Sequence, residues 1–323
     1  MTITNKSVSQ SSKIYVAGHG GLVGAAIMRR LQASGYANVV TRSHAELDLL
    51  DQATTMAFLA QEKPDYIFMA AARTGGIYAN NTLPAEFIYQ NLMVQANIIH
   101  SAYRVGTRRA LFLGSSCIYP RECSQPIAEE ALLTGRLEPT NEPYAIAKIA
   151  GIKMCESYNR QYGTEFVTFM PTNLYGPNDN YDLNSGHVLP ALIRKAHEAK
   201  VRGEHELMVW GSGMPMREFL YVDDLAEACI FMMESSITEG MFNVGTGEEV
   251  TIRALAETVM DIVGFKGIIV FDATKPDGTP RKLLNVDRMT SLGWHASTSL
   301  RNGIVLAYAD FLSQLNQGKL SPP

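Results

Sequence analysis

The sequence has few charged residues, few cysteines and no long apolar run, and each shortage excludes a class of protein. Lys and Arg number 28 against 32 Asp and Glu, so the net charge is −4; with no basic excess, nucleic acid is not expected as a partner. No apolar run approaches the roughly 20 residues of a membrane span, so no membrane partner is expected. The four cysteines form no Cys-x-x-Cys pair and no zinc-ligand spacing. The sequence therefore predicts a cytoplasmic protein with reduced thiols and no metal site.

What the sequence does contain is a large apolar fraction arranged in a regular alternation. Hydrophobic residues make up 46% of the 323 residues, which is enough for a large core. Strands are expected at 13–17, 39–40, 66–71, 110–113 and 166–170, and helices from about Leu22, around 56–61, at 84–103 and at 144–162. This alternation predicts an α/β fold, a Rossmann-type doubly wound parallel sheet with helices on both faces.

The sequence pattern changes after Gly176-Pro177, where segments interrupted by glycine and proline replace the regular alternation of strands and helices. We expect residues 1–12 to form a flexible tail. Residues 13–176 plus about 217–247 are expected to form a dinucleotide-binding Rossmann domain. Residues of about 177–216 and 248–323 are expected to form a smaller, partly discontinuous α/β domain for the substrate.

A glycine-rich turn follows the first expected strand. Its glycines permit a tight turn and a close approach to a pyrophosphate, which the N-terminus of the next helix stabilises. The predicted cofactor contacts are Gly18, His19, Gly20, Gly21, Leu22, Val23 and Gly24. The second strand is followed by Arg42 and not by the acid typical of NAD sites. Arg42 is expected to bind a 2′-phosphate, which favours NADP(H) over NAD; the alternative is a solvated surface arginine.

Tyr144 and Lys148 lie one helical turn apart. This spacing places an ammonium near a phenol, where it lowers the pKa of the tyrosine so that the tyrosine can exchange a proton with a carbonyl oxygen. Ser115, at the end of the fourth expected strand, is placed to donate a hydrogen bond to the same carbonyl. The glycine turn, the strand-end serine and the Tyr-x-x-x-Lys pair together resemble the short-chain dehydrogenase/reductase superfamily, extended branch.

Longer strings resemble the GDP-L-fucose synthase family within that superfamily, and the likeness extends from about residue 13 to the end. The most specific strings are Gly114-Ser115-Ser116-Cys117-Ile118-Tyr119-Pro120, the eleven residues 138–148, Met170-Pro171-Thr172-Asn173-Leu174-Tyr175-Gly176-Pro177, and residues 209–213, 217–219 and 275–282. The resemblance implies NADPH-dependent 3,5-epimerisation and 4-reduction of GDP-4-keto-6-deoxy-D-mannose to GDP-L-fucose. It also implies a homodimer and makes the second domain a nucleotide-sugar-binding domain.

The resemblance further implies which residues carry this chemistry. Catalytic roles are implied for Ser115, Cys117, Tyr144, Lys148 and His187, with Cys117 and His187 exchanging protons on opposite faces of the sugar. Contacts with the GDP-sugar are implied for Lys195, Trp210, Arg217 and Asp277. Contacts with the nicotinamide end of the cofactor are implied for Leu113, Gly114, Ser115, Ser116, Tyr144, Lys148, Pro171, Thr172, Asn173, Leu174 and His187.

Alternatives stay open for single residues and for the function. Without the resemblance, Cys117 can be interpreted as a small buried hydrophobic residue, and His187 as a helix-start or packing histidine. Arg217 can be interpreted as the partner of Asp223 or Asp224 in a structural ion pair. Family members commonly have arginine where this chain has Gly20, and some have arginine where it has His44. The preference for NADPH over NADH is therefore expected to be weaker in this chain. Lys195 likewise stands where arginine is often found in the family.

Two rival functions remain. One is a 4-reductase or an epimerase/reductase for a related GDP-4-keto sugar, such as a heptose or a dideoxy sugar. The other is a cofactor-binding sensor or scaffold without catalysis, against which the intact tyrosine–lysine pair argues.

Overall fold

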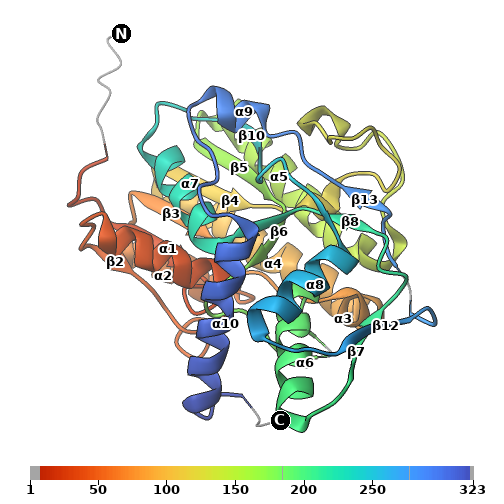
Figure 1. Ribbon diagram of the computed structural model, residues 1–323. Coiled ribbons are helices and arrows are strands. Elements are labelled where there is room, and N and C mark those ends of the chain that lie inside the picture. Colours follow the sequence, from red (N-terminus) through yellow and green to blue (C-terminus); the bar gives the residue numbers. More distant parts are fainter. Residues whose placement is uncertain (1–7, 184, 276, 321–323) are drawn as a thin grey trace.

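The computed structural model describes residues 8–183, 185–275 and 277–320 (Figure 1). Its central feature is a six-stranded parallel sheet in the order β10-β5-β4-β3-β1-β2. The strands are β1 (Ile14–Ala17), β2 (Val39–Val40), β3 (Tyr66–Met69), β4 (Arg109–Leu113), β5 (Glu165–Pro171) and β10 (Gly240–Val244). The prediction of a Rossmann-type parallel sheet is therefore confirmed, although the third strand ends at Met69, two residues before the expected end.

Both faces of this sheet are covered by helices. On one face lie α1 (Leu22–Ala33) and α7 (Val222–Glu234); on the other lie α2 (Gln52–Glu62), α4 (Pro84–Val105) and α5 (Glu142–Tyr162). Successive residues of β1 point to opposite faces of the sheet. Ile14 and Val16 pack in the core formed with α1 and α7, whereas Tyr15 and Ala17 pack in the core formed with α2, α4 and α5. Burial on both faces explains why these strands are continuous apolar runs in the sequence.

Local signals set the ends of the two long helices. Pro84 and Pro143 stand in the first turns of α4 and α5, where a missing N–H costs nothing. Gly106 and Gly163 end the same helices in the left-handed conformation, at φ +77° and +68°. The sequence analysis missed α3 (Ile77–Thr82) and the short 3₁₀ helix η1 (Ser116–Ile118), because segments of three to six residues carry little periodic signal.

The rest of the chain builds smaller sheets and a third core. The helices α6 (Val188–Arg202), α8 (Ile252–Val263) and α10 (Leu300–Asn316) enclose this core together with the parallel pair β7 (Glu206–Trp210) and β12 (Ile268–Asp272), and in Figure 1 these elements lie below the main sheet. The strands β11 (Val250–Thr251), β8 (Met216–Arg217) and β13 (Arg281–Lys282) form a three-stranded sheet, β6 (Asn173–Tyr175) pairs with β9 (Phe219–Tyr221), and α9 (Asp287–Ser291) follows β13.

The N-terminal segment is only partly described. Residues 1–7 of the expected tail lie outside the described residues. Within 8–12, Val8 packs against the core on the α1 face, and the side chain of Gln10 donates a 3.3 Å hydrogen bond to the carbonyl of Ser34. Among the helices of the described ranges, none is long and apolar enough to span a bilayer.

Candidate active site

A cavity of about 610 Å³ lies at the carboxyl ends of the parallel strands, where β1 has β2 on one side and β3 on the other. This reversal of strand order is where ligands bind in such sheets. Most of the predicted site residues line the cavity: Gly21, Leu22, Val23, Leu113, Gly114, Ser115, Ser116, Cys117, Tyr144, Lys148, Pro171, Thr172, Asn173, Leu174, His187, Lys195, Trp210, Arg217 and Asp277. Five residues predicted to contact the cofactor are not among the described residues that line the cavity: Gly18, His19, Gly20, Gly24 and Arg42.

The glycine turn has the shape that a dinucleotide needs. Gly18 has φ +81°, and a Cβ there would lie 2.7 Å from the backbone of Ala71. A Cβ at Gly24 would lie 2.0 Å from the carbonyl oxygen of Gly18, so Gly24 lets α1 pack closely on the turn. Gly21, by contrast, faces the cavity, and the N-terminus of α1 follows directly at Leu22. Gly18 and Gly24 therefore shape the turn, and residues 21–23 are the ones that would hold a cofactor pyrophosphate.

Arg42 follows β2 and is already engaged by protein groups. Its Nη2 lies 2.9 Å from Oε1 of Glu62, and its guanidinium carbon lies 5.0 Å from the centre of the Phe58 ring. The sequence analysis did not foresee the carboxylate, which comes from the end of α2. Binding of a 2′-phosphate by Arg42 stays a prediction, and it would have to compete with Glu62.

Tyr144 and Lys148 project from one face of α5 toward the end of β4. Lys148 is 3% exposed, and its Nζ donates a 2.8 Å hydrogen bond to the carbonyl of Leu113. The same ammonium lies 5.8 Å from the centre of the Tyr144 ring. Ser115 follows β4, and its Oγ accepts a 3.2 Å hydrogen bond from the backbone N–H of Cys117. The structure thus brings the predicted serine, tyrosine and lysine together.

The ionisation of this group differs from the expectation. Burial raises the pKa of Tyr144, Cys117 adds to the rise, and a hydrogen bond with Ser115 lowers it. Burial also lowers the pKa of Lys148 to about 8. The expected lowering of the tyrosine pKa by the lysine is therefore wrong for this structure, because desolvation of the phenol is the largest effect. Helical spacing alone cannot reveal that desolvation.

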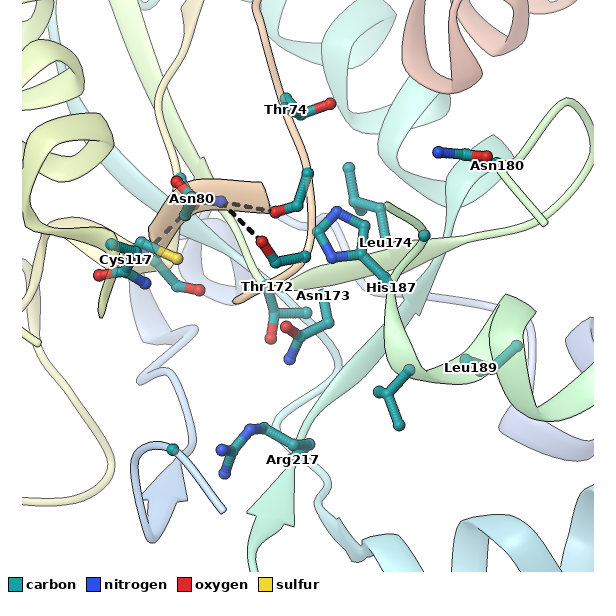
Figure 2. Close-up of a pocket in the computed structure, with 18 of the residues that line it drawn as sticks. Thr74, Asn80, Cys117, Thr172, Asn173, Leu174, Asn180, His187, Leu189 and Arg217 are labelled. Atoms are coloured by element: carbon teal, nitrogen blue, oxygen red, sulfur yellow. Dashed lines mark hydrogen bonds between the residues drawn. The ribbon is translucent and has the colours of Figure 1, made fainter. Parts of the chain in front are cut away.

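Cys117 and His187 lie on opposite sides of the cavity, with Thr172 and Asn173 between them (Figure 2). Cys117 is the middle residue of η1 and is half-buried. His187 stands at the N-cap of α6 (φ −78°, ψ 168°), as expected for a helix-start histidine, but its side chain faces the cavity. Desolvation at the cavity wall, followed by the charge of Lys282, lowers the pKa of His187.

The far end of the cavity combines cations with an exposed aromatic surface. Trp210 is 44% exposed, and the ammonium groups of Lys195 and Lys275 lie 4.9 and 5.3 Å from its ring. Arg217 donates to the carbonyls of Met216 at 2.8 Å and Asp277 at 3.4 Å. Such a surface suits a flat base next to a pyrophosphate.

The alternative of an ion pair between Arg217 and the acids of α7 does not fit the contacts. Asp223 pairs with Arg29. Asp224 accepts hydrogen bonds from Ser297 and from the backbone N–H of Thr298. Arg217 is therefore held at the cavity by backbone carbonyls.

Several cavity residues were not singled out from the sequence. Lys282 lies at the wall beside Cys117, with 3.5 Å between Nζ and Sγ. Asn80, Asn141 and Asp179 also line the cavity, and each has one buried side-chain oxygen without a hydrogen-bond partner among the described residues. Such oxygens can accept hydrogen bonds from sugar hydroxyl groups. Glu138 lines the cavity too, and its Oε2 lies 3.5 Å from Nε of Arg121. Glu138, Asn141 and Lys282 lie within family-like strings, which was the available signal.

Comparison with known proteins gives a consistent result. The model of the NAD dependent epimerase/dehydratase family matches residues 14–245. The chain is 57% identical over 306 residues to GDP-L-fucose synthase 1 of Arabidopsis thaliana, covering 95% of each chain. It is 54% identical over 309 residues to the GDP-L-fucose synthase of Escherichia coli strain K12, covering 93% of this chain and 96% of the relative.

Solved structures agree with these sequence relatives. A GDP-L-fucose synthetase of Naegleria fowleri bound to NADP superposes with a TM-score of 0.89 at 29% identity, covering 96% of this chain and 95% of that chain. A GDP-6-OMe-4-keto-L-xylo-heptose reductase of C. jejuni also reaches 0.89, at 36% identity, covering 95% and 99%. The chain belongs to the NAD dependent epimerase/dehydratase family.

Proposed function

We propose that this chain is an NADPH-dependent enzyme that converts GDP-4-keto-6-deoxy-D-mannose to GDP-L-fucose by epimerising carbons 3 and 5 and reducing carbon 4. Identities of 54–57% with GDP-L-fucose synthases over nearly the whole chain support this function. One structural observation carries it: a single cavity holds both the Tyr144–Lys148 pair and, on its two sides, Cys117 and His187. Reduction needs the first pair, and epimerisation needs the second.

In the reduction, Tyr144 donates the proton that the C4 oxygen takes up as the ketone becomes an alcohol. Ser115 donates a hydrogen bond to the same oxygen, and Lys148 places a positive charge near it. The nicotinamide cofactor, held by residues 21–23 and by those at the ends of β4 and β5, supplies the hydride when bound. The cofactor is NADP(H).

In the epimerisation, Cys117 as thiolate removes a proton from a ring carbon next to the ketone. The C–H bond breaks, an S–H bond forms, and the electron pair moves onto the ketone oxygen. His187 as imidazolium returns a proton to the opposite face, so its N–H bond breaks as the new C–H bond forms. Exchange with water restores both residues, so each epimerisation replaces one sugar proton by a solvent proton, at carbon 3 and again at carbon 5.

We assign binding of the nucleotide to the far end of the cavity. Trp210 offers its face to the base, and Lys195 and Arg217 neutralise the pyrophosphate. Asp277 holds the rim, since its carboxylate accepts 2.7 and 2.8 Å hydrogen bonds from the backbone N–H and the hydroxyl of Ser212. In domain terms, residues 13–176 with 217–247 bind the cofactor, and residues 177–216 with 248–323 bind the GDP-sugar.

We also propose that the protein is a cytoplasmic homodimer. The four cysteines are free thiols, which fits a reducing compartment. For the dimer, the supporting surface is the outer side of α4 and α5, where Tyr103 stacks on Tyr162 with 4.1 Å between ring centres, and Tyr89 and Tyr162 are exposed. Light scattering during gel filtration tests this, and a monomer mass across the micromolar range would contradict it.

The function is tested by incubating the protein with GDP-4-keto-6-deoxy-D-mannose and NADPH in deuterated water. GDP-L-fucose carrying deuterium at carbons 3 and 5 is the expected product. The rival function is that of a plain 4-reductase for a related GDP-4-keto sugar. The similarity to the C. jejuni heptose reductase supports this rival. A reduced product without deuterium at those carbons would favour that rival and contradict the proposal.

A further inference from the structure

Lys282 contacts the sulfur of Cys117 although 165 residues separate them in the chain. Its Nζ lies 3.5 Å from Sγ. The contact arises from the three-stranded sheet, in which β13 runs parallel to β8 and Lys282 pairs with Arg217 in the register. Two cations from adjacent strands therefore stand at the wall of the cavity beside the thiol.

The two cations are engaged differently. Arg217 directs its donors to the carbonyls of Met216 and Asp277, whereas Lys282 reaches the sulfur itself. The other ionisable groups around the thiol are Tyr144 from α5, which burial keeps neutral, and Glu138, which acts on Arg217. Of these groups, Lys282 has the direct contact and the sign of charge that favours a thiolate.

Lys282 and His187 both line the cavity. Lys282 is the charged group that, after burial, disfavours the protonated imidazole. A cation beside both residues makes Cys117 easier to ionise and makes the imidazolium of His187 a stronger acid. Both effects suit a thiolate that removes a proton and an imidazolium that returns one.

We propose that Lys282 is a positioning residue for epimerisation, which sets the ionisation of both Cys117 and His187 and does not itself touch the reacting carbons. The role in epimerisation rests on the function proposed above. The effect on ionisation is a property of the protein without any sugar, and it can be measured separately.

The first test is the pH dependence of alkylation of Cys117 by iodoacetamide, followed by peptide mass spectrometry. The other thiols are half-buried or buried, and burial raises their pKa. Lys282→Met is expected to move the midpoint for Cys117 upward by about one pH unit or more, with about tenfold slower labelling at pH 7. Lys282→Arg keeps a cation and should stay near the wild-type curve.

A matched control removes a lysine far from the thiol. Lys153 is exposed and pairs with Glu156 at 2.8 Å on α5, so Lys153→Met should leave the labelling curve unchanged. The proposal is overturned if Lys282→Met labels like wild type, or if the Met and Arg variants shift equally, since the second result would indicate a structural effect and not a charge effect.

The second test is the NMR titration of His187, assigned by comparison with His187→Asn. In Lys282→Met the midpoint is expected to move to higher pH, because a repelling charge is gone; an unchanged midpoint contradicts the proposal. Deuterium uptake by the sugar at pH 7 should fall about tenfold in Lys282→Met and recover at higher pH. Labelling and NMR shifts without any GDP-L-fucose formation would refute the proposed function but leave the role of Lys282 in ionisation standing.

Discussion

Replacing Lys148 by methionine is expected to stabilise the fold while destroying reduction. The side chain is 3% exposed, and burial lowers its pKa from the ordinary 10.5 to about 8. At about 1.4 kcal/mol per pH unit, keeping this ammonium charged in the folded protein costs about 3 kcal/mol at pH 7. Methionine removes that cost and has a similar length.

Part of the gain is lost with the contacts of the ammonium. The carbonyl of Leu113 loses a 2.8 Å donor, which costs about 1 kcal/mol. The variant is therefore expected to be more stable by about 2 kcal/mol at pH 7. Reduction should fall by at least about a hundredfold, because the charge near Tyr144 is gone.

The pH dependence separates this explanation from better packing. Because the folded pKa lies below the unfolded one, the unfolded wild type binds more protons between about pH 8 and 10.5, and wild-type stability rises with pH across that window. The methionine variant lacks this contribution, so its advantage should shrink to nearly zero by about pH 9.5. Urea denaturation at matched protein concentration measures the difference. A variant less stable than wild type at pH 7, or an advantage that does not change with pH, would refute the reasoning.

Three further predictions concern the site. Tyr144→Phe should lower turnover in NADPH oxidation by about two to four decades with cofactor binding retained; near-normal turnover would remove Tyr144 from the chemistry. Arg42→Ala should lower the ratio of kcat/KM for NADPH over NADH, and Glu62→Gln should raise it, because the carboxylate 2.9 Å from Arg42 would be gone; two unchanged ratios would exclude Arg42 from phosphate binding. Cys117→Ser should stop deuterium uptake at carbons 3 and 5, since a serine hydroxyl is not ionised near neutrality, and His187→Asn should slow it, both measured by mass spectrometry with NADP⁺ in deuterated water. Full uptake by the serine variant would leave Cys117 as a packing residue.

The residues of the site that come shortly after the strands of the parallel sheet could be predicted from the sequence. Gly21, Ser115 and Tyr144 belong to a strand–turn–helix alternation whose geometry is general to parallel sheets, so their meeting at one edge follows from the fold class. The same reasoning failed for the pKa of Tyr144, because the enclosure of a side chain by distant segments cannot be read from spacing. It missed Glu62 beside Arg42 for a related reason: α2 extends to Glu62, beyond the expected 56–61.

The contact between Lys282 and Cys117 was out of reach of sequence patterns. It depends on the register of β13, a strand of two residues, and so short a strand carries no periodic signal. Resemblance to a family marked the string around Lys282 but did not say which side chain it would meet. Only the pairing of Lys282 with Arg217 across the β8–β13 ladder places the ammonium at the sulfur.

In the proposed mechanism the two half-reactions depend on different parts of the architecture. The proposed residues for reduction either follow β4, as Ser115 does, or stand on α5, as Tyr144 and Lys148 do. The cations beside Cys117 stand on β8 and β13, and the buried carboxylate of Glu218 holds these strands in place. It accepts hydrogen bonds of 2.6, 2.8 and 3.0 Å from the backbone N–H groups of Thr246, Gly247 and Leu284, and so ties β8 to the segment that follows β13. Loosening this anchor is expected to displace Lys282 from the thiol, so the proposed role of Lys282 in epimerisation depends on packing in the second part of the chain.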